Sequence, residues 1–195
     1  MGEYELYTRI LSSGIKHEDQ KILTEGKANH RAKICDKNCD SYIVYRYDQE
    51  EMDELFFPFF NKSHNDGDTI VDNPAPSDLL RFCDYIIIAE RKNRLYVILI
   101  EMKSGRNAEA RKQIDASNAF MQYIKESAKR IAKSNAYYDF DANNIVERSI
   151  ILKPEKVIRP LTSIGKSKNY NQYPDFKQPY ATLYSNDIPL KEICN

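Results

Sequence analysis

Two apolar segments in the middle of the chain, residues 84–90 and 95–103, give the clearest hydrophobic pattern in the sequence. Both segments are rich in Ile, Leu, Val and Tyr, and the four polar residues 91–94 separate them. Apolar runs of this length joined by a short polar turn predict a β-hairpin. Because apolar side chains alternate onto both faces of each strand, we expect the hairpin to be covered on both sides and to lie inside a sheet.

After the hairpin the period of the pattern changes. Between residues 107 and 133 apolar or small residues recur at spacings of three and four, namely Ala110, Ile114, Ser117, Met121, Ile124, Ala128 and Ile131. This spacing predicts a long amphipathic helix whose opposite face carries lysines and arginines. Residues 148–152 predict a further strand, and a strand–helix–strand crossover makes that strand parallel to one of the hairpin strands.

Shorter patterns precede the hairpin. Residues 4–11 predict a short helix, and the β-branched and aromatic residues of 41–47 predict a strand. Residues 50–60 favour a helix that stops or bends at Pro58. Residues 61–78 combine Gly and Pro with Asn, Asp and Ser, which indicates a long loop.

The carboxyl-terminal residues 159–195 are rich in Tyr, Asn, Pro and Lys, and predict irregular structure with one further strand or helix. The order of the other elements predicts a mixed α/β fold. A chain of 195 residues fits a single domain, 1–195. We expect its core over about residues 4–153 and an irregular extension over 154–195.

Composition limits the function classes. Hydrophobic residues make up 42% of the chain, with 14 Tyr and 8 Phe, which is enough for a folded core. Lys and Arg together number 29, as do Asp and Glu, so the net charge of zero indicates no partner. The apolar runs are far shorter than the roughly 20 residues of a membrane span, and the first residues have no secretory pattern. We therefore expect a cytoplasmic protein without a membrane partner.

The sequence contains four cysteines, which reduced thiols in a cytosol would explain. Cys35 and Cys39 also have the spacing of half a zinc site, but a second pair is missing. His64 and Cys83 could complete such a site only if folding brought them together. Ordinary thiols are the favoured interpretation.

Charge is unevenly distributed along the chain. Residues 48–84 carry ten acids against two bases, a net charge of −8. Residues 90–133 carry eleven bases against five acids, a net charge of +6. Solvated loops and a solvated helix face are the favoured explanation of this pattern. A basic face beside a catalytic hairpin would instead indicate a surface that binds phosphates.

Three charged residues interrupt one apolar face of the predicted hairpin. If the turn is centred between residues 92 and 93, Asp84 lies directly opposite Glu101, and Lys103 lies further along the same face. Two opposed carboxylates repel each other, and burial makes the repulsion worse. Either Lys103 as a counter-ion or a divalent cation would offset it, and a salt bridge at the end of a strand is the structural alternative.

The arrangement of these residues resembles a known family. Asp84, followed by Glu101-Met102-Lys103 at the end of the next strand, then by Ser104-Gly105 and a helix, is similar to the motif of the PD-(D/E)XK nuclease superfamily. The resemblance implies the restriction-endonuclease-like fold, an αβββαβ core with a central mixed sheet flanked by helices. It also implies that Asp84 and Glu101 bind Mg²⁺, for which Mn²⁺ can substitute, that the carbonyl of Met102 completes the metal site, and that Lys103 assists the attacking water.

The sequence departs from the family pattern at several positions. Cys83 stands in the place of the proline, and Gln113 is followed four residues later by Ser117 rather than by the tyrosine of one branch. Gln113 could point toward the site or be a solvated helix residue. Many members add a glutamate from the first helix, for which Glu18 and Glu25 are both candidates.

The function expected from the resemblance is that of a metal-dependent nuclease with catalytic residues Asp84, Glu101 and Lys103. The expectation favours DNA over RNA, and double-strand cleavage would require a homodimer or successive nicks. Candidate substrate-binding residues are Gln113, Arg106, Arg111 and Lys112, with Arg91, Lys92 and Arg94 as further bases for the phosphate backbone. Tyrosines of residues 168–184 could stack on bases or belong to the core. The alternatives are a nuclease fold kept as a nucleic-acid-binding or protein-interaction module, and an interaction protein whose three charges form a salt bridge.

Overall fold

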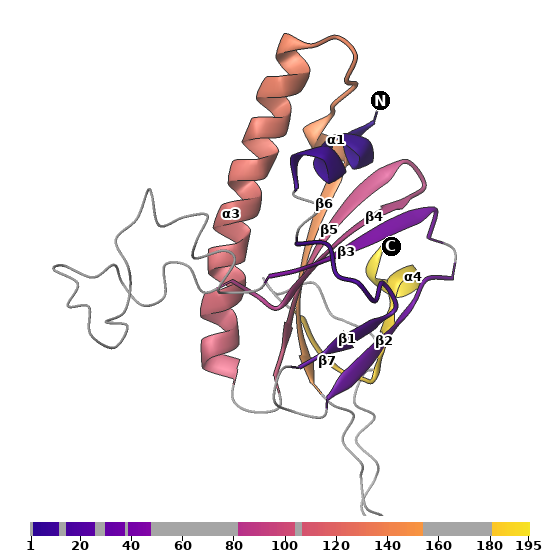
Figure 1. The fold of residues 1–195 in the computed structure, drawn as a ribbon, viewed down its shortest axis with the longest axis vertical. Coiled ribbons are helices and arrows are strands. Elements are labelled where there is room, and N and C mark those ends of the chain that lie inside the picture. The colour runs from indigo at the N-terminus through magenta and orange to yellow at the C-terminus, as the bar shows by residue number, and fades with distance from the viewer. Residues whose placement is uncertain are drawn as a thin grey trace, which may run out of the picture.

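The computed structural model describes residues 2–11, 15–25, 30–37, 39–47, 82–103, 107–153 and 181–195. The predicted helix 50–60, the predicted loop 61–78, Arg106 and most of the tyrosine-rich segment 168–184 lie outside these residues. Within them, no helix is long and apolar enough to cross a membrane. The described elements form a mixed α/β structure with two open sheets (Figure 1).

The larger sheet has five strands in the order β3-β4-β5-β6-β7. Their bounds are β3 Ser41–Arg46, β4 Tyr85–Arg91, β5 Arg94–Met102, β6 Ile145–Lys153 and β7 Ala181–Tyr184. The first three strands are antiparallel, whereas β6 runs parallel to β5 and β7 runs parallel to β6. The predicted strand 41–47 and the parallel strand after the long helix are therefore confirmed.

The β4–β5 hairpin turns more tightly than its sequence suggested. Only Lys92 and Asn93 form the turn, with φ angles of 51° and 58°. Two central residues with positive φ match the type I′ turn, whose twist suits antiparallel strands. The register pairs Tyr85 with Ile100 and Ile88 with Val97, which confirms the predicted alignment of the two strands.

Helices cover one face of the larger sheet. α1 spans Glu3–Ile10 and α3 spans Asn107–Ser134. The predicted apolar positions of α3 from Ala110 to Ala128 are buried, and Ile131 is partly buried, which confirms the helical periodicity. Their side chains share a core with α1 and with the face of the hairpin that carries Ile86, Val97 and Leu99. Most arginines and lysines of α3 lie on its exposed side, as predicted.

The opposite face of the larger sheet is covered by a second sheet, in contrast to the predicted layer of helices. Its strands, in the order β1-β2-β8, are β1 Ile22–Thr24, β2 Arg31–Cys35 and β8 Asp187–Pro189, followed by the short helix α4, Leu190–Ile193. Strand β1 is antiparallel to β2, and β8 is parallel to β2. Figure 1 shows α3 on one side of the large sheet and this small sheet with α4 on the other.

The carboxyl-terminal residues correct a prediction. Residues 181–195 were expected to be mostly irregular, but they supply β7 to one sheet and β8 to the other. Both strands are only three or four residues long, so their pairing partners rather than their own patterns define them. A 3₁₀ helix, η2 Ala142–Asn144, leads into β6, which begins earlier than predicted.

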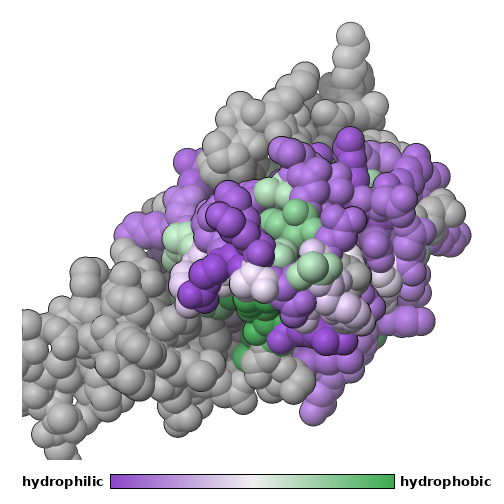
Figure 2. All heavy atoms as spheres, turned by 90° about the horizontal axis from the view of Figure 1, so that it is seen from above, coloured by the Kyte–Doolittle hydropathy of each residue, from purple (hydrophilic) through white to green (hydrophobic). Residues whose placement is uncertain are grey.

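Hydrophilic residues dominate the described surface in the view from above, with apolar side chains visible in the middle (Figure 2).

Candidate functional site

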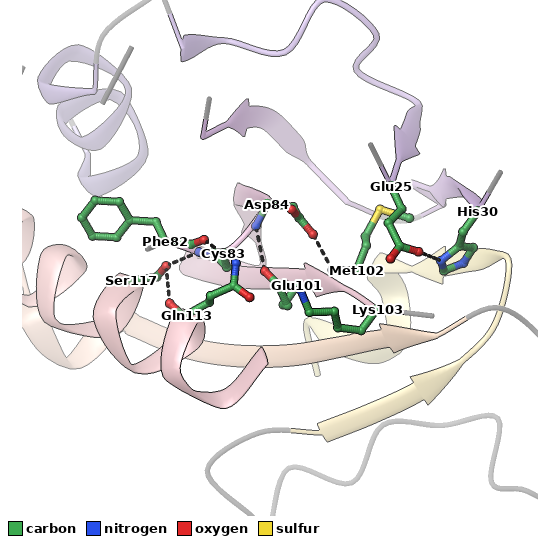
Figure 3. Close-up of polar contacts among 10 residues, drawn as sticks. All are labelled: Glu25, His30, Phe82, Cys83, Asp84, Glu101, Met102, Lys103, Gln113 and Ser117. Atoms are coloured by element: carbon green, nitrogen blue, oxygen red, sulfur yellow. Dashed lines mark hydrogen bonds and ion pairs between the residues drawn. The ribbon is translucent and has the colours of Figure 1, made fainter. Parts of the chain in front are cut away.

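The candidate site lies where β4 begins and β5 ends, at the far end of the hairpin from its turn. Asp84 directly precedes β4, Glu101 belongs to β5, and Lys103 directly follows β5. The confirmed register, extended by one pair, sets Asp84 opposite Glu101. Figure 3 shows these residues together, beside the first half of α3.

Each carboxylate of the pair accepts a hydrogen bond from the other strand. The Asp84 N–H donates to Glu101 Oε2 at 3.2 Å, and the Met102 N–H donates to Asp84 Oδ2 at 2.7 Å. Glu101 Oε1 lies 2.8 Å from Lys103 Nζ in an ion pair. Glu101 has no exposed surface, and the Lys103 side chain is 25% exposed. The predicted proximity of the three charged residues is thus present in the structure.

Burial and mutual charge contacts shift the pKa of all three groups. It raises the pKa of Glu101 to about 7, with the charge of Asp84 adding to the shift and Lys103 opposing it. Burial also raises the pKa of Asp84, against the Met102 hydrogen bond and the Lys103 charge. Burial alone would lower the pKa of Lys103, but its hydrogen bond and charge contact with Glu101 outweigh burial and raise it. Lys103, together with the charge of Arg46 on Asp84, therefore does not offset the burial of the two carboxylates, and an added cation would be favoured there.

Two side chains of α3 hold the segment that leads into Asp84. Gln113 Nε2 donates to Phe82 O at 3.2 Å. Ser117 Oγ accepts from the Cys83 N–H at 2.7 Å and donates to Gln113 O at 2.9 Å. Gln113 therefore lies beside the site, where it binds the backbone, a role that the sequence did not predict.

The basic residues of the hairpin turn do not surround this site. Lys92 and Arg94 are exposed, but the seven residues of β4 separate them from Asp84, a span of roughly 23 Å. Arg91 is only 7% exposed, and its Nη1 donates to Lys191 O, to Cys194 O at 2.9 Å and to Asn195 Oδ1 at 2.8 Å. Because its guanidinium is buried against the end of α4, the prediction that Arg91 carries phosphates is wrong. Arg111 and Lys112 are exposed on the first half of α3.

The described cysteines give the zinc interpretation no support. All four are free, and Cys39 Sγ donates to Ser41 O at 3.2 Å. In the part of the chain that the structure describes, no three His, Cys, Asp or Glu side chains are grouped so that they could hold a metal ion. His64 lies outside that part. A metal held by Asp84 and Glu101 would consequently need ligands besides these two carboxylates.

A second acidic group lies near Asp84 from the small sheet. The charge of Glu25, at the end of β1, raises the pKa of Asp84, whereas Glu18 is exposed. Figure 3 shows Glu25 and His30 facing each other next to Met102. From the sequence, Glu25 is only one of two candidate glutamates and His30 is not predicted, because no pattern indicates the β1–β2 hairpin that carries both residues.

Comparisons of the chain with protein-family models, with curated proteins and with solved structures found no match. The site consists of a buried carboxylate pair, one lysine and two backbone amides at the end of an interior hairpin.

Proposed function

We propose that the protein is a metal-dependent nuclease that hydrolyses phosphodiester bonds, in DNA rather than RNA. The observation that carries this proposal is the buried pair Asp84 and Glu101 with one lysine, Lys103, as a counter-ion. Burial raises the pKa of both carboxylates although Lys103 and, for Asp84, Arg46 oppose it, so a further cation would favour their charged forms.

The donor set suits Mg²⁺ or Mn²⁺. Both ions prefer oxygen ligands, and Mg²⁺ commonly takes one or two carboxylates with waters and substrate phosphate. Asp84 and Glu101 would hold the ion, with the carbonyl of Met102 as a further oxygen, and hydrogen bonds already fix both carboxylates. When bound, such an ion polarises a phosphate and lowers the pKa of a bound water.

The protein residues have separate tasks in this proposal. Lys103, held 2.8 Å from Glu101, would orient the attacking water or stabilise the charge that develops on the phosphate. Arg111 and Lys112, exposed on α3, would attract the nucleic-acid backbone. Gln113 and Ser117 position the backbone of residues 82–83, next to Asp84.

The order of elements agrees with the restriction-endonuclease-like core. The sequence α1, β3, β4, β5, α3, β6 corresponds to the αβββαβ arrangement, with the β1–β2 hairpin between α1 and β3. The carboxylates lie at the end of the central hairpin, followed by the long helix. This agreement in the order of the elements supports the proposal, and so does the carboxylate site.

Cleavage of plasmid DNA tests the proposed function. The full chain is incubated with supercoiled plasmid, single-stranded DNA and RNA in Mg²⁺, Mn²⁺ or EDTA. We expect cleavage with either metal and none in EDTA. Asp84→Asn and Glu101→Gln should abolish detectable cleavage, because each removes a metal ligand, and Lys103→Met should slow it roughly 10²–10³-fold.

The control variants are Asp115→Asn and Lys133→Met, which change exposed charges on α3. Both should cleave as wild type does. Cleavage by Glu101→Gln at the wild-type rate would contradict the assignment. Binding of DNA without metal-dependent cleavage would favour the inactive nucleic-acid-binding module instead.

A further inference from the structure

Glu25 and His30 form the last pair of the β1–β2 hairpin. The strands pair Thr24 with Arg31, and the Glu25 N–H then donates to His30 O at 3.0 Å. Residues that face each other across two antiparallel strands place their side chains on the same side. Figure 3 shows the two side chains directed toward each other.

His30 is buried without the hydrogen bonds that an imidazole ordinarily makes. Its exposed fraction is 5%, and neither ring nitrogen makes a hydrogen bond of ordinary geometry among the described residues, where its polar contacts are the Glu25 carboxylate and the backbone of Ser185. A polar ring that leaves water without a partner of good geometry costs free energy. The buried nitrogens therefore favour a ligand that can replace the lost water.

The separation of the two side chains fits two ligands of one metal ion. Glu25 Oε2 lies 3.7 Å from His30 Nδ1, which is an ion-pair distance when the imidazole is protonated but is too long for a hydrogen bond. Ligand atoms that are each about 2.1 Å from one ion lie roughly 3.0–4.2 Å apart, according to the angle between them. The observed distance falls inside this range.

Tyr85 attaches this pair to the carboxylate site. Its hydroxyl accepts from the Thr24 N–H at 3.0 Å and donates to Thr24 O at 2.9 Å. Thr24 directly precedes Glu25, and Tyr85 directly follows Asp84, so the hydroxyl joins the two segments. The pair of Glu25 and His30 thus lies on the small-sheet side of Asp84. Figure 3 shows Met102 between this pair and Asp84.

We propose that Glu25 and His30 bind a divalent transition-metal ion, distinct from the ion assigned to Asp84 and Glu101. A site with an imidazole nitrogen and a carboxylate suits Mn²⁺, Co²⁺ or Zn²⁺, whereas Mg²⁺ prefers oxygen ligands alone. Waters or a substrate phosphate would supply the other ligands. The binding of this ion does not depend on nuclease activity, and only a catalytic use of the ion would rest on the proposed function.

Titration with Co²⁺ alone, followed by calorimetry and visible absorption, tests the second site in the full chain. Wild type should bind two Co²⁺ ions, and an excess of Mg²⁺ should displace only one. Glu25→Gln and His30→Gln should each bind one ion. The double variant Asp84→Asn, Glu101→Gln should also bind one ion, and that ion should resist Mg²⁺.

Matched controls separate this site from other side chains. Glu18→Gln changes an exposed carboxylate just before the same hairpin. His17→Gln and His64→Gln remove the other two histidines of the sequence. All three variants should bind two ions, and two ions bound by His30→Gln with wild-type affinity would overturn the proposal.

NMR spectra of the wild-type protein test the second metal site if His30→Gln fails to fold. In protein labelled with ¹⁵N-histidine, Zn²⁺ should shift the ring-nitrogen signal of His30, and an unchanged His30 signal at saturating Zn²⁺ would contradict the proposal. Absence of nucleic-acid cleavage together with two bound Co²⁺ ions would overturn the nuclease proposal alone. Metal-dependent cleavage with one Co²⁺ ion bound would overturn the second site alone.

Discussion

Glu101 has no exposed surface, and its two oxygens have different partners. Oε2 accepts the Asp84 N–H, and Oε1 lies beside Lys103 Nζ. Because burial raises its pKa to about 7, the folded protein holds the Glu101 proton more tightly than the unfolded chain does, where the pKa is near 4.5. Glu101 is therefore a source of pH-dependent stability in the metal-free protein.

The sign of this dependence follows from the raised pKa. The contribution of Glu101 to the free energy of unfolding is complete below pH 4.5 and is lost as the pH rises through 7, an effect on the order of 3 kcal/mol. Glu101→Gln should therefore flatten the fall in stability between pH 5 and pH 8, measured by urea denaturation in EDTA. The exposed Glu18→Gln should keep the wild-type slope. A wild-type slope in Glu101→Gln would show that the carboxyl is not perturbed.

The charged residues of the hairpin were predictable for a simple reason. Side chains alternate along a strand, so the centre of one turn sets which residues face each other. Asp84, Glu101 and Lys103 followed from that arithmetic, and the structure brings them together. Glu25 and His30 reach the same region from another hairpin, and no local pattern reports such a long-range contact.

At the scale of elements, α3 contributes packing and hydrogen bonding to the site. Its apolar residues lie on the sheet, while Gln113 and Ser117, one turn apart, bind the backbone of residues 82 and 83. Ser117 is fully buried. Its hydroxyl is the partner of the Cys83 N–H, which precedes Asp84.

Replacement of Ser117 tests this contact. Ser117→Ala leaves the buried Cys83 N–H without an acceptor, and it should lower the free energy of unfolding by about 1–3 kcal/mol in urea denaturation. The matched variant Ser134→Ala, at the exposed end of the same helix, loses hydrogen bonds only to nearby carbonyls of its own helix. It should change stability by less than about 0.5 kcal/mol. Equal losses in the two variants would contradict a positioning role for Ser117.

Length and periodicity explain which elements the sequence predicted. α3 repeats its apolar spacing over 28 residues, and each hairpin strand is a nearly continuous apolar run. Strands β1 and β8 are three residues long, and each buries a single side chain. A pattern that short cannot be told from a loop, so the small sheet was missed although it covers one face of the core.

At the scale of the whole molecule, Tyr85 joins the two sheets. It belongs to β4 of the large sheet, and its hydroxyl makes both hydrogen bonds to Thr24 of the small sheet. His17 packs edge-on against its ring at 5.2 Å. The phenol group therefore contributes to the position of the β1–β2 hairpin relative to Asp84, together with the apolar core that the two sheets share.

Tyr85→Phe removes that group and leaves the ring in place. The variant should lose about 1–3 kcal/mol of stability. Amide hydrogen exchange should accelerate at Thr24 and Glu25 but remain slow in β5, because β5 is held by the strands on either side. Tyr96→Phe, on the same face of the sheet, should leave the exchange of β1 unchanged. Slow exchange at Thr24 in Tyr85→Phe would show that other contacts hold the two sheets together.

The parallel pair β2–β8 has a consequence for how the chain is assembled during synthesis. It joins Lys33 to Asp187, roughly 150 residues further along, and such distant contacts slow folding through the entropy of loop closure. While the ribosome is adding the middle of the chain, β2 and β6 each present an unpaired edge, and the guanidinium of Arg91 lacks its acceptors near α4. Both sheets become complete only after residues 181–195 have left the ribosome. In nascent chains that lack these residues, the unpaired edges of β2 and β6 are therefore the surfaces most prone to aggregation.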